Sequence, residues 1–210
     1  MNIAAARGHL EVVKWLASMW KEMPSPITGA ALNGHLDVVQ WIFAQKRWSR
    51  RCGARAMDNA AMSDHLEIVK WLHENRKGSC SENVMDGAAA NGHLEVVKYL
   101  HEHRKGGCSV LAMDGAAENG HLEVVKWIHE HQSERCSTMA MTYAACNGHL
   151  DVIQWLHANK SEGCTPFAMN GAAENGHLDI VKWLHENRSE GRTSSAMAFA
   201  AKRGHIQMAS

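Results

Sequence analysis

Histidine is the residue type in this chain that could most readily support chemistry. The chain has 15 histidines, and His101-Glu-His103 and His129-Glu-His131 each place two imidazoles around a glutamate. A zinc protease carries His-Glu-x-x-His on a helix, but the last position holds Lys105 after His101 and Ser133 after His129. Residues two apart on a helix point about 200° away from each other, so neither pair can share one ion. We therefore predict no metal site.

Catalytic motifs of other kinds are absent from the sequence. It contains no nucleophile elbow, no phosphate-binding glycine loop and no paired-cysteine zinc motif. Carboxylates are abundant, but they recur at regular intervals, whereas catalysis needs one singular arrangement of groups. The sequence therefore predicts a protein that is not an enzyme and that has no catalytic residues and no cofactor.

Most of the histidines belong to a repeated pattern. Eight follow a glycine or, once, Asp64, which tolerates the left-handed conformation of glycine better than most residues do. These eight are His9, His35, His65, His93, His121, His149, His177 and His205. Their spacings are 26, 30 and then 28 residues throughout. A period in this range is typical of a solenoid, in which each repeat buries its apolar surface against its neighbours.

The period divides the chain into eight repeats that form one array over residues 1–210. We predict a partial first repeat, a truncated last repeat and these boundaries: 1–21, 22–51, 52–79, 80–107, 108–135, 136–163, 164–191 and 192–210. Neither end shows the polar capping repeat that an isolated array needs. We therefore expect either a monomer with frayed ends or a part of a longer array.

Each repeat has the pattern of two helices joined by a turn, as repeat seven shows. Thr165 is the expected N-cap of the first helix and Pro166 its first residue, since a helix accepts proline in its first turn. The helix is predicted to run to Asn175, and Gly176 supplies the left-handed residue that ends it. The second helix is predicted to start near Leu178. The sequence thus predicts an all-α protein.

Two sets of side chains are expected to hold the repeats together. The Ala and Met positions of the first helix should face the core; in repeat seven these are Ala168, Met169, Ala172 and Ala173. One aromatic residue per second helix forms a column: Trp15, Trp41, Trp71, Tyr99, Trp127, Trp155 and Trp183. An aromatic column at this spacing predicts core or inter-repeat packing, because no single repeat can bury such a surface.

The run Ala172-Ala-Glu-Asn-Gly-His-Leu-Asp-Ile-Val-Lys-Trp-Leu184 resembles the ankyrin repeat, whose consensus has paired alanines, Gly-His, two β-branched residues and leucines. The resemblance covers nearly the whole chain and implies a helical-repeat solenoid of helix-turn-helix units. Ankyrin units have about 33 residues, whereas these have 28. The shortfall lies in linkers such as residues 159–164, where ankyrins place projecting β-hairpin fingers. The resemblance therefore implies fingers that are reduced or absent.

The charge balance and the cysteine spacing indicate which classes of partner to exclude and which cellular compartment to expect. The 22 basic and 22 acidic residues balance, which argues against a bulk nucleic-acid or membrane-surface binder. Five cysteines recur every 28 residues, at Cys52, Cys80, Cys108, Cys136 and Cys164. Stacked layers lie about 8–10 Å apart, too far for disulfides within this column. We expect free, buried thiols and an intracellular, reducing location, the cytoplasm, with the nucleus as the alternative.

Residues that break the repeat pattern are candidates for a binding surface. Positions three, six and ten before the turn histidine follow one line of the first helix, and in repeat six they are Cys146, Tyr143 and Met139. Leu111 and Phe167 occupy the Met139 position in the adjoining repeats. These five residues could form an apolar patch that anchors a partner protein. Alternatively, the residues at the Met139 position pack beneath the preceding linker, and the sequence leaves both interpretations open.

The segment 46–55 is a second departure from the pattern, in an interval two residues longer than its peers. It carries Lys46, Arg47, Trp48, Arg50, Arg51 and Arg55. Such a segment could contact phosphate, nucleic acid or an acidic partner, or it could be a solvated loop.

These patterns together predict a non-enzymatic protein–protein interaction module or scaffold. Its first-helix, concave face would bind a partner protein that the sequence does not identify. The alternative is phosphate or nucleic-acid contact through the basic segment 46–55, which the neutral net charge disfavours.

Overall fold

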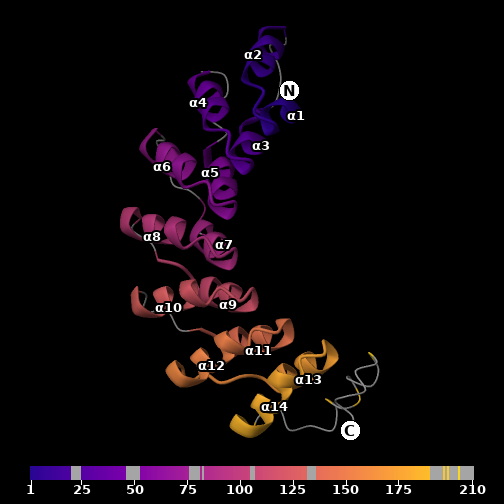
Figure 1. Ribbon diagram of the computed structural model, residues 1–210. Helices are drawn as coiled ribbons and strands as arrows, with labels where there is room; N and C mark the ends of the chain where they lie inside the picture. The colour runs from indigo at the N-terminus through magenta and orange to yellow at the C-terminus, as the bar shows by residue number, and fades with distance from the viewer. Residues whose placement is uncertain are drawn as a thin grey trace. The chain divides into compact units, whose positions relative to one another are not determined.

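Helices are the only regular elements in the described part of the chain, which comprises residues 1–19, 25–45, 53–75, 81, 83–104, 107–131, 136–189, 196, 198 and 203 of the computed structural model. They are α1 (Asn2–Ala6), α2 (Leu10–Met19), α3 (Ile27–Leu32), α4 (Leu36–Ala44), α5 (Gly53–Met62), α6 (Leu66–Asn75), α7 (Val84–Ala90), α8 (Leu94–His103), α9 (Val110–Glu118), α10 (Leu122–His131), α11 (Thr138–Asn147), α12 (Leu150–Asn159), α13 (Phe167–Glu174) and α14 (Leu178–Asn187) (Figure 1). The predicted all-α class is confirmed. None of these helices is both long and apolar enough to span a membrane.

The chain forms two compact parts. The N-terminal part is Met1–Ala88 with His93–Gly107, and the C-terminal part is Ala89–Gly92 with Cys108–Ser210. Within each part the first helices of successive repeats pack on each other, as α1, α3 and α5 do, and as α9, α11 and α13 do. Each of these first helices also packs on the second helix of its own repeat. This arrangement confirms a helical-repeat solenoid, while the division into eight repeats stays a prediction.

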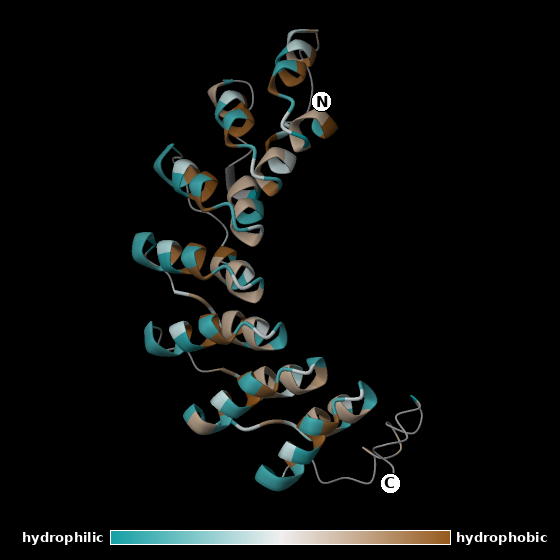
Figure 2. Cartoon of the chain, in the orientation of Figure 1, coloured by the Kyte–Doolittle hydropathy of each residue, from teal (hydrophilic) through white to brown (hydrophobic). Residues whose placement is uncertain are grey.

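The core of each repeat lies between its two helices. In repeat seven, Ala168, Met169, Ala172 and Ala173 of α13 are buried, as the sequence predicts. The second helix starts at the predicted Leu178 and buries Ile180 and Leu184. Figure 2 shows the hydrophobic segments of paired first and second helices facing each other. Small alanines on one helix and branched residues on the other let the two helices approach closely.

The start of α13 differs from the prediction. Pro166 takes the N-cap position and the helix runs over Phe167–Glu174, so the element is one residue shorter at each end than predicted. The hydroxyl of Thr165 does not cap the helix. It donates instead to Oγ1 of Thr142 (3.1 Å), which in turn donates to the carbonyl of Thr138 (2.7 Å). A contact with the preceding repeat thus replaces the local cap that the sequence favoured.

The linker after α12 contains no strand, which fits reduced fingers at this position. Residues 160–166 connect α12 to α13 and are all described.

The turns between the first and second helices have the conformation that the sequence predicts. Gly176 has φ of +83°, and Asp64 has φ of +61°, the left-handed conformation expected of a residue that replaces glycine.

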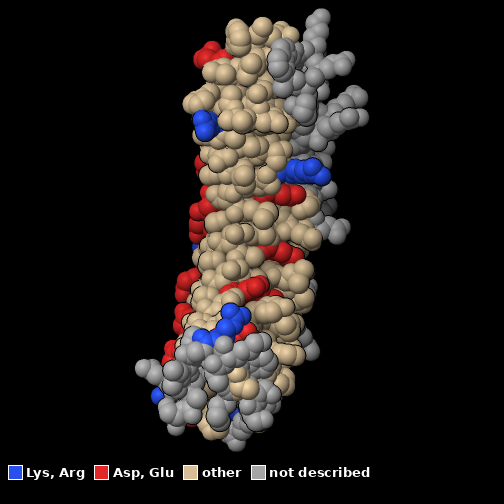
Figure 3. All heavy atoms as spheres, turned by 90° about the vertical axis from the view of Figure 1, so that its right-hand side faces the viewer, with Lys and Arg blue, Asp and Glu red and all other residues tan. Residues whose placement is uncertain are grey.

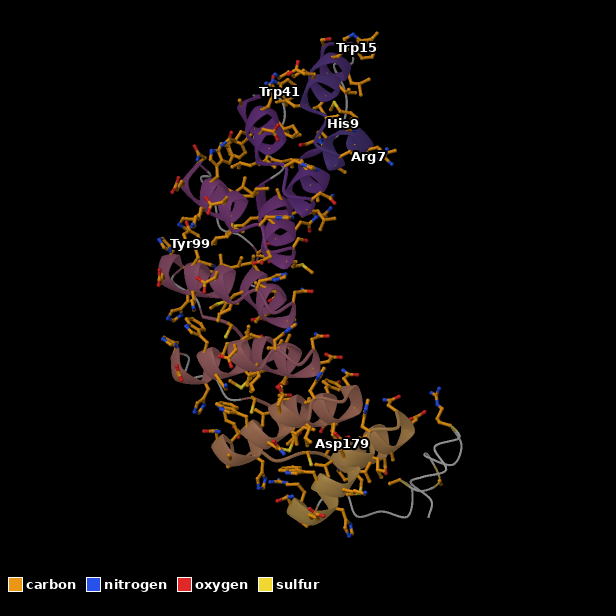
Figure 4. The ribbon with its side chains drawn as sticks, in the orientation of Figure 1. Arg7, His9, Trp15, Trp41, Tyr99 and Asp179 are labelled. Carbon is orange, nitrogen blue, oxygen red and sulfur yellow. The ribbon has the colours of Figure 1, made fainter. Side chains whose placement is uncertain are left out.

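The aromatic column packs between repeats rather than in the core. Trp155 meets the ring of His129 edge-on at a centroid distance of 5.2 Å, and Trp183 meets His157 in the same way at 5.1 Å. Trp71 packs edge-on against Phe43. In each pair the contacting ring lies two positions after the preceding repeat's aromatic residue. Figure 4 shows Trp15, Trp41 and Tyr99 on second helices of the N-terminal part; Trp15 is 60% exposed.

A second set of inter-repeat contacts joins the first helices to the following linker. The buried carboxylate of Asp114 accepts hydrogen bonds from the backbone N–H of Ser137 (3.0 Å) and from its hydroxyl. In the next repeat, Oγ1 of Thr142 accepts the N–H of Thr165 (3.0 Å). These polar side chains satisfy backbone donors that burial would otherwise leave without partners.

The cysteine column behaves as expected at its described positions. Cys108, Cys136 and Cys164 are buried and form no disulfide, so the prediction of small, buried residues outside disulfides is confirmed there. Cys52 and Cys80 lie outside the described residues.

The buried thiol of Cys136 should make the stability of the folded protein depend on pH. Burial, helped by the nearby charge of Glu162, raises the pKa of this thiol from 9.0 to about 11. The folded state therefore binds more protons than the unfolded state between these two values, and stability falls as pH rises through that window. We expect Cys136→Ser to reduce this fall, as measured by urea unfolding of both proteins below, within and above the window. Equal slopes for the two proteins would contradict the assignment.

Candidate partner-binding surface

Three consecutive first helices carry the predicted apolar patch. Leu111 lies on α9, Met139, Tyr143 and Cys146 lie on α11, and Phe167 lies on α13. Phe167 is 72% exposed, Leu111 61% and Tyr143 38%, whereas Met139 and Cys146 are half-buried. All five belong to the C-terminal part, and α11 packs between α9 and α13. The structure thus brings the predicted residues onto adjoining helices.

Glycines set how closely these helices approach. A Cβ on Gly115 would lie 2.8 Å from Cβ of Ala90, and one on Gly171 would overlap Sγ of Cys146. Two repeat positions therefore contact each other. The residue six positions before a turn histidine lies against the residue three positions before the turn histidine of the preceding repeat. Tyr143 breaks this rule, because it places a large ring where its neighbours have no side chain. The ring is consequently part of the surface.

Local capping positions the outer residues of the patch. The hydroxyl oxygen of Ser109 accepts the N–H of Leu111 (3.1 Å), and that of Ser137 accepts the N–H of Met139 (3.0 Å). Phe167 follows Pro166, whose φ of −55° suits the start of a helix. Each of these outer side chains therefore projects from the first turn of its helix, held by a defined start.

Carboxylates surround the thiol of Cys146. Burial raises the pKa of this thiol, and the charges of Glu174 and Glu118 raise it further. Both glutamates lie three residues before a turn histidine, the position that Cys146 holds on α11. Figure 3, which faces the side of the first helices in Figure 1, shows acidic atoms among uncharged ones on this face. Two glutamates thus lie near Cys146 on this face.

The exposures separate the two interpretations of the outer residues. Leu111 and Phe167 present most of their side chains to solvent, which disagrees with packing beneath the preceding linker. Met139 is half-buried and fits either interpretation. Its hydrophobic neighbours are therefore the stronger members of the patch.

The basic segment lies almost wholly outside the described residues. This applies to Lys46, Arg47, Trp48, Arg50 and Arg51. Arg55 is described and is exposed near the start of α5, in the N-terminal part. Phosphate or nucleic-acid contact through this segment stays a prediction.

The histidines have structural roles where their contacts are described. Nε2 of His35, His65 and His93 donates to the backbone carbonyl of Ala6 (3.1 Å), Leu32 (3.0 Å) and Met62 (2.9 Å), in that order. Each contact joins the turn histidine of one repeat to the end of the first helix of the preceding repeat. Among the described residues no three histidine, cysteine or acidic side chains gather as a metal site would require.

The two histidines outside the repeated columns close the ends of second helices. Nδ1 of His103 donates to the carbonyl of Tyr99 (2.9 Å), and Nδ1 of His131 donates to that of Trp127 (3.0 Å). Asn159 donates to Trp155 in the equivalent place (2.8 Å). Sequence reasoning missed this role, although the alternation of His and Asn at one position was a visible signal.

Sequence reasoning also missed apolar residues on the first helices of the N-terminal part. Ile3, Leu32 and Met62 are exposed there. They stand six, three and three residues before their turn histidines. The rule that found the patch would have found them as well.

A family model for ankyrin repeats, in three copies, matches the chain in overlapping stretches at residues 1–86, 27–114, 60–133, 87–166 and 112–194. None of the curated proteins compared with the chain matches it.

Proposed function

Because the chain belongs to the ankyrin repeat family, we propose that it is a scaffold that binds a protein partner on the first-helix face of α9, α11 and α13. Ankyrin repeats are generally protein–protein interaction modules and are typically not enzymes. The observation that carries the proposal is the exposure of Phe167 and Leu111 on either side of Tyr143.

These exposures support binding because large apolar side chains rarely stay in water without a use when they gather. Aromatic residues at the centre of an interface commonly contribute most of the binding energy, within a rim that excludes water. Tyr143 has this central position, because it lies on the middle one of the three helices. The patch is also rigid, since α11 packs on both neighbouring helices.

A role without catalysis agrees with how the polar side chains are used. The turn histidines bind neighbouring carbonyls, and Asp114 binds a backbone N–H. Cys108, Cys136 and Cys164 are buried and form no disulfide, which supports a reducing location that we propose to be the cytoplasm.

Affinity capture from an extract of the native cell tests the proposal. The wild-type chain is compared with the double variant Tyr143→Ala, Phe167→Ala, and captured proteins are quantified by mass spectrometry. We expect recovery of a specific partner to fall by roughly 10-fold or more, because truncating central aromatic side chains costs about 2 kcal/mol or more.

The double variant Val12→Ala, Trp15→Ala provides a matched control, because it removes exposed apolar surface from α2, in the N-terminal part of the chain. It should leave recovery unchanged. Circular dichroism should show the same helix content in all three proteins. Equal recovery by the wild type and the patch variant would exclude this face as the binding site.

A further inference from the structure

A carboxylate without a cation lies at the edge of the patch. Glu118 is the half-buried last residue of α9. Its backbone carbonyl accepts a hydrogen bond from Nδ2 of Asn147 (2.8 Å). Its carboxylate makes no ion pair with any residue in the described part of the chain. This half-buried carboxylate is therefore available to pair with a cation from another molecule.

Glu174 shows what binds a carboxylate at this position. It stands at the equivalent place on α13, three residues before a turn histidine. Its Oε1 accepts hydrogen bonds from Nη2 (3.0 Å) and Nε (3.2 Å) of Arg203. Arg203 holds the same repeat position relative to Glu174 as Asn147 holds relative to Glu118. The chain therefore supplies an arginine to one of these carboxylates and an uncharged amide to the other.

Glu118 and the apolar patch form one continuous surface. Burial is the main cause of the raised pKa of the Cys146 thiol, and the charges of Glu174 and, to a smaller extent, Glu118 add to it, so Glu118 lies near that thiol. Gly115 packs on Ala90, and Gly171 packs on Cys146. Tyr143 and Glu118 occupy the same two repeat positions as the members of these pairs. By this register, Tyr143 lies beside Glu118 of the preceding repeat. An aromatic face beside a carboxylate is an arrangement that attracts an arginine or lysine side chain.

From this juxtaposition we propose that the partner's binding segment carries an arginine or lysine that pairs with Glu118, flanked by apolar side chains that cover the patch. The inference rests on the proposed function and names the chemistry of its partner. A partner without a cation would bury the carboxylate with no compensating charge, which is unfavourable. A cationic segment instead gains a charge-assisted hydrogen bond of the kind that Arg203 makes with Glu174.

A phage-displayed library of random peptides is a suitable probe because it presumes no partner. Peptides retained by the wild-type chain are sequenced, and one is synthesised and titrated against wild type and variants. We expect the retained peptides to combine arginine or lysine with apolar residues. Glu118→Lys should weaken binding by about 10-fold or more. Glu130→Lys is the matched control, because it makes the same charge change at an exposed site on α10, and it should change affinity less than about 2-fold.

A charge exchange sharpens the test. Replacing the peptide's cationic residue with glutamate should restore binding to the Glu118→Lys variant. Retained peptides that lack a cation, or equal affinity for wild type and Glu118→Lys, would overturn the inference. If Phe167→Ala loses binding but Glu118→Lys does not, the proposed function stands and the inference that the partner supplies a cation fails. If neither variant matters, or if no peptide is retained better by wild type than by Phe167→Ala, both proposals fail.

Discussion

Replacing Gly120 with valine should lower the free energy of unfolding by about 3–4 kcal/mol. Gly120 has φ of +75°, a conformation that costs an L-residue about 1–2 kcal/mol and a β-branched residue more. A Cβ there would also lie 2.5 Å from Nδ1 and 2.6 Å from Cε1 of His149. The imidazole would have to leave the turn, so the contact between two repeats would be lost together with the favourable backbone.

Asp64 suggests the matched control for this substitution. It occupies the equivalent turn of repeat three with φ of +61°, and its carboxylate lies 3.8 Å from Nδ1 of His93. An aspartate therefore fits beside the next repeat's histidine. Gly120→Asp should cost only about 1 kcal/mol. Urea unfolding followed by circular dichroism compares both variants with wild type. A valine variant as stable as the aspartate variant would show that the turn accommodates a branched side chain.

The fold could be predicted because every local signal in a repeat agrees with the others. The helical period, the small residues of the first helix and the left-handed turn all indicate the same unit, and repetition removes the ambiguity of any single copy. The start of α14 at Leu178 and the conformation of Asp64 follow from these signals alone. The N-cap of α13 did not, because Thr165 has a better partner in Thr142 than in its own helix.

Contacts between repeats were harder to predict because they join residues that are distant in sequence. Asp114 and Ser137 are 23 positions apart in the sequence, so the periodicity of a single helix does not indicate that they contact each other. The signal was nevertheless present. The two positions hold Asp114 and Ser137 in one pair of repeats, and Thr142 and Thr165 in the next, so the residue types at the two positions change together. Recognising it requires knowing that a first helix faces the next linker.

The patch was only partly predictable for a related reason. Periodicity identified the line on which Leu111, Tyr143 and Phe167 stand, but exposure depends on the path of the neighbouring linker. For Phe167 this linker is residues 160–166, which contain no helix or strand. The role of Glu118 was missed because charged residues on a repeat surface are usually only solvated.

Replacing Asp114 with alanine is the second substitution with a large expected effect, about 2–4 kcal/mol of lost stability. Asp114 is 7% exposed and accepts both the backbone N–H and the hydroxyl of Ser137. Alanine would leave the N–H of the half-buried Ser137 without this acceptor. Asp114→Thr should cost only about 1 kcal/mol, since Thr142 shows that a threonine hydroxyl accepts the equivalent N–H. Urea unfolding of both variants measures the difference.

The loss at Asp114 should also reach the binding surface. The Ser137 hydroxyl donates to Asp114 while its oxygen accepts the N–H of Met139, so the carboxylate orients the cap of α11. In Asp114→Ala the cap loses that orientation, and the amide of Met139 should exchange its hydrogen faster than in Asp114→Thr. Because α11 carries both Met139 and Tyr143, a frayed helix start would weaken partner binding without any substitution in the patch itself. Unchanged exchange at Met139 would show that the cap forms independently of the preceding repeat.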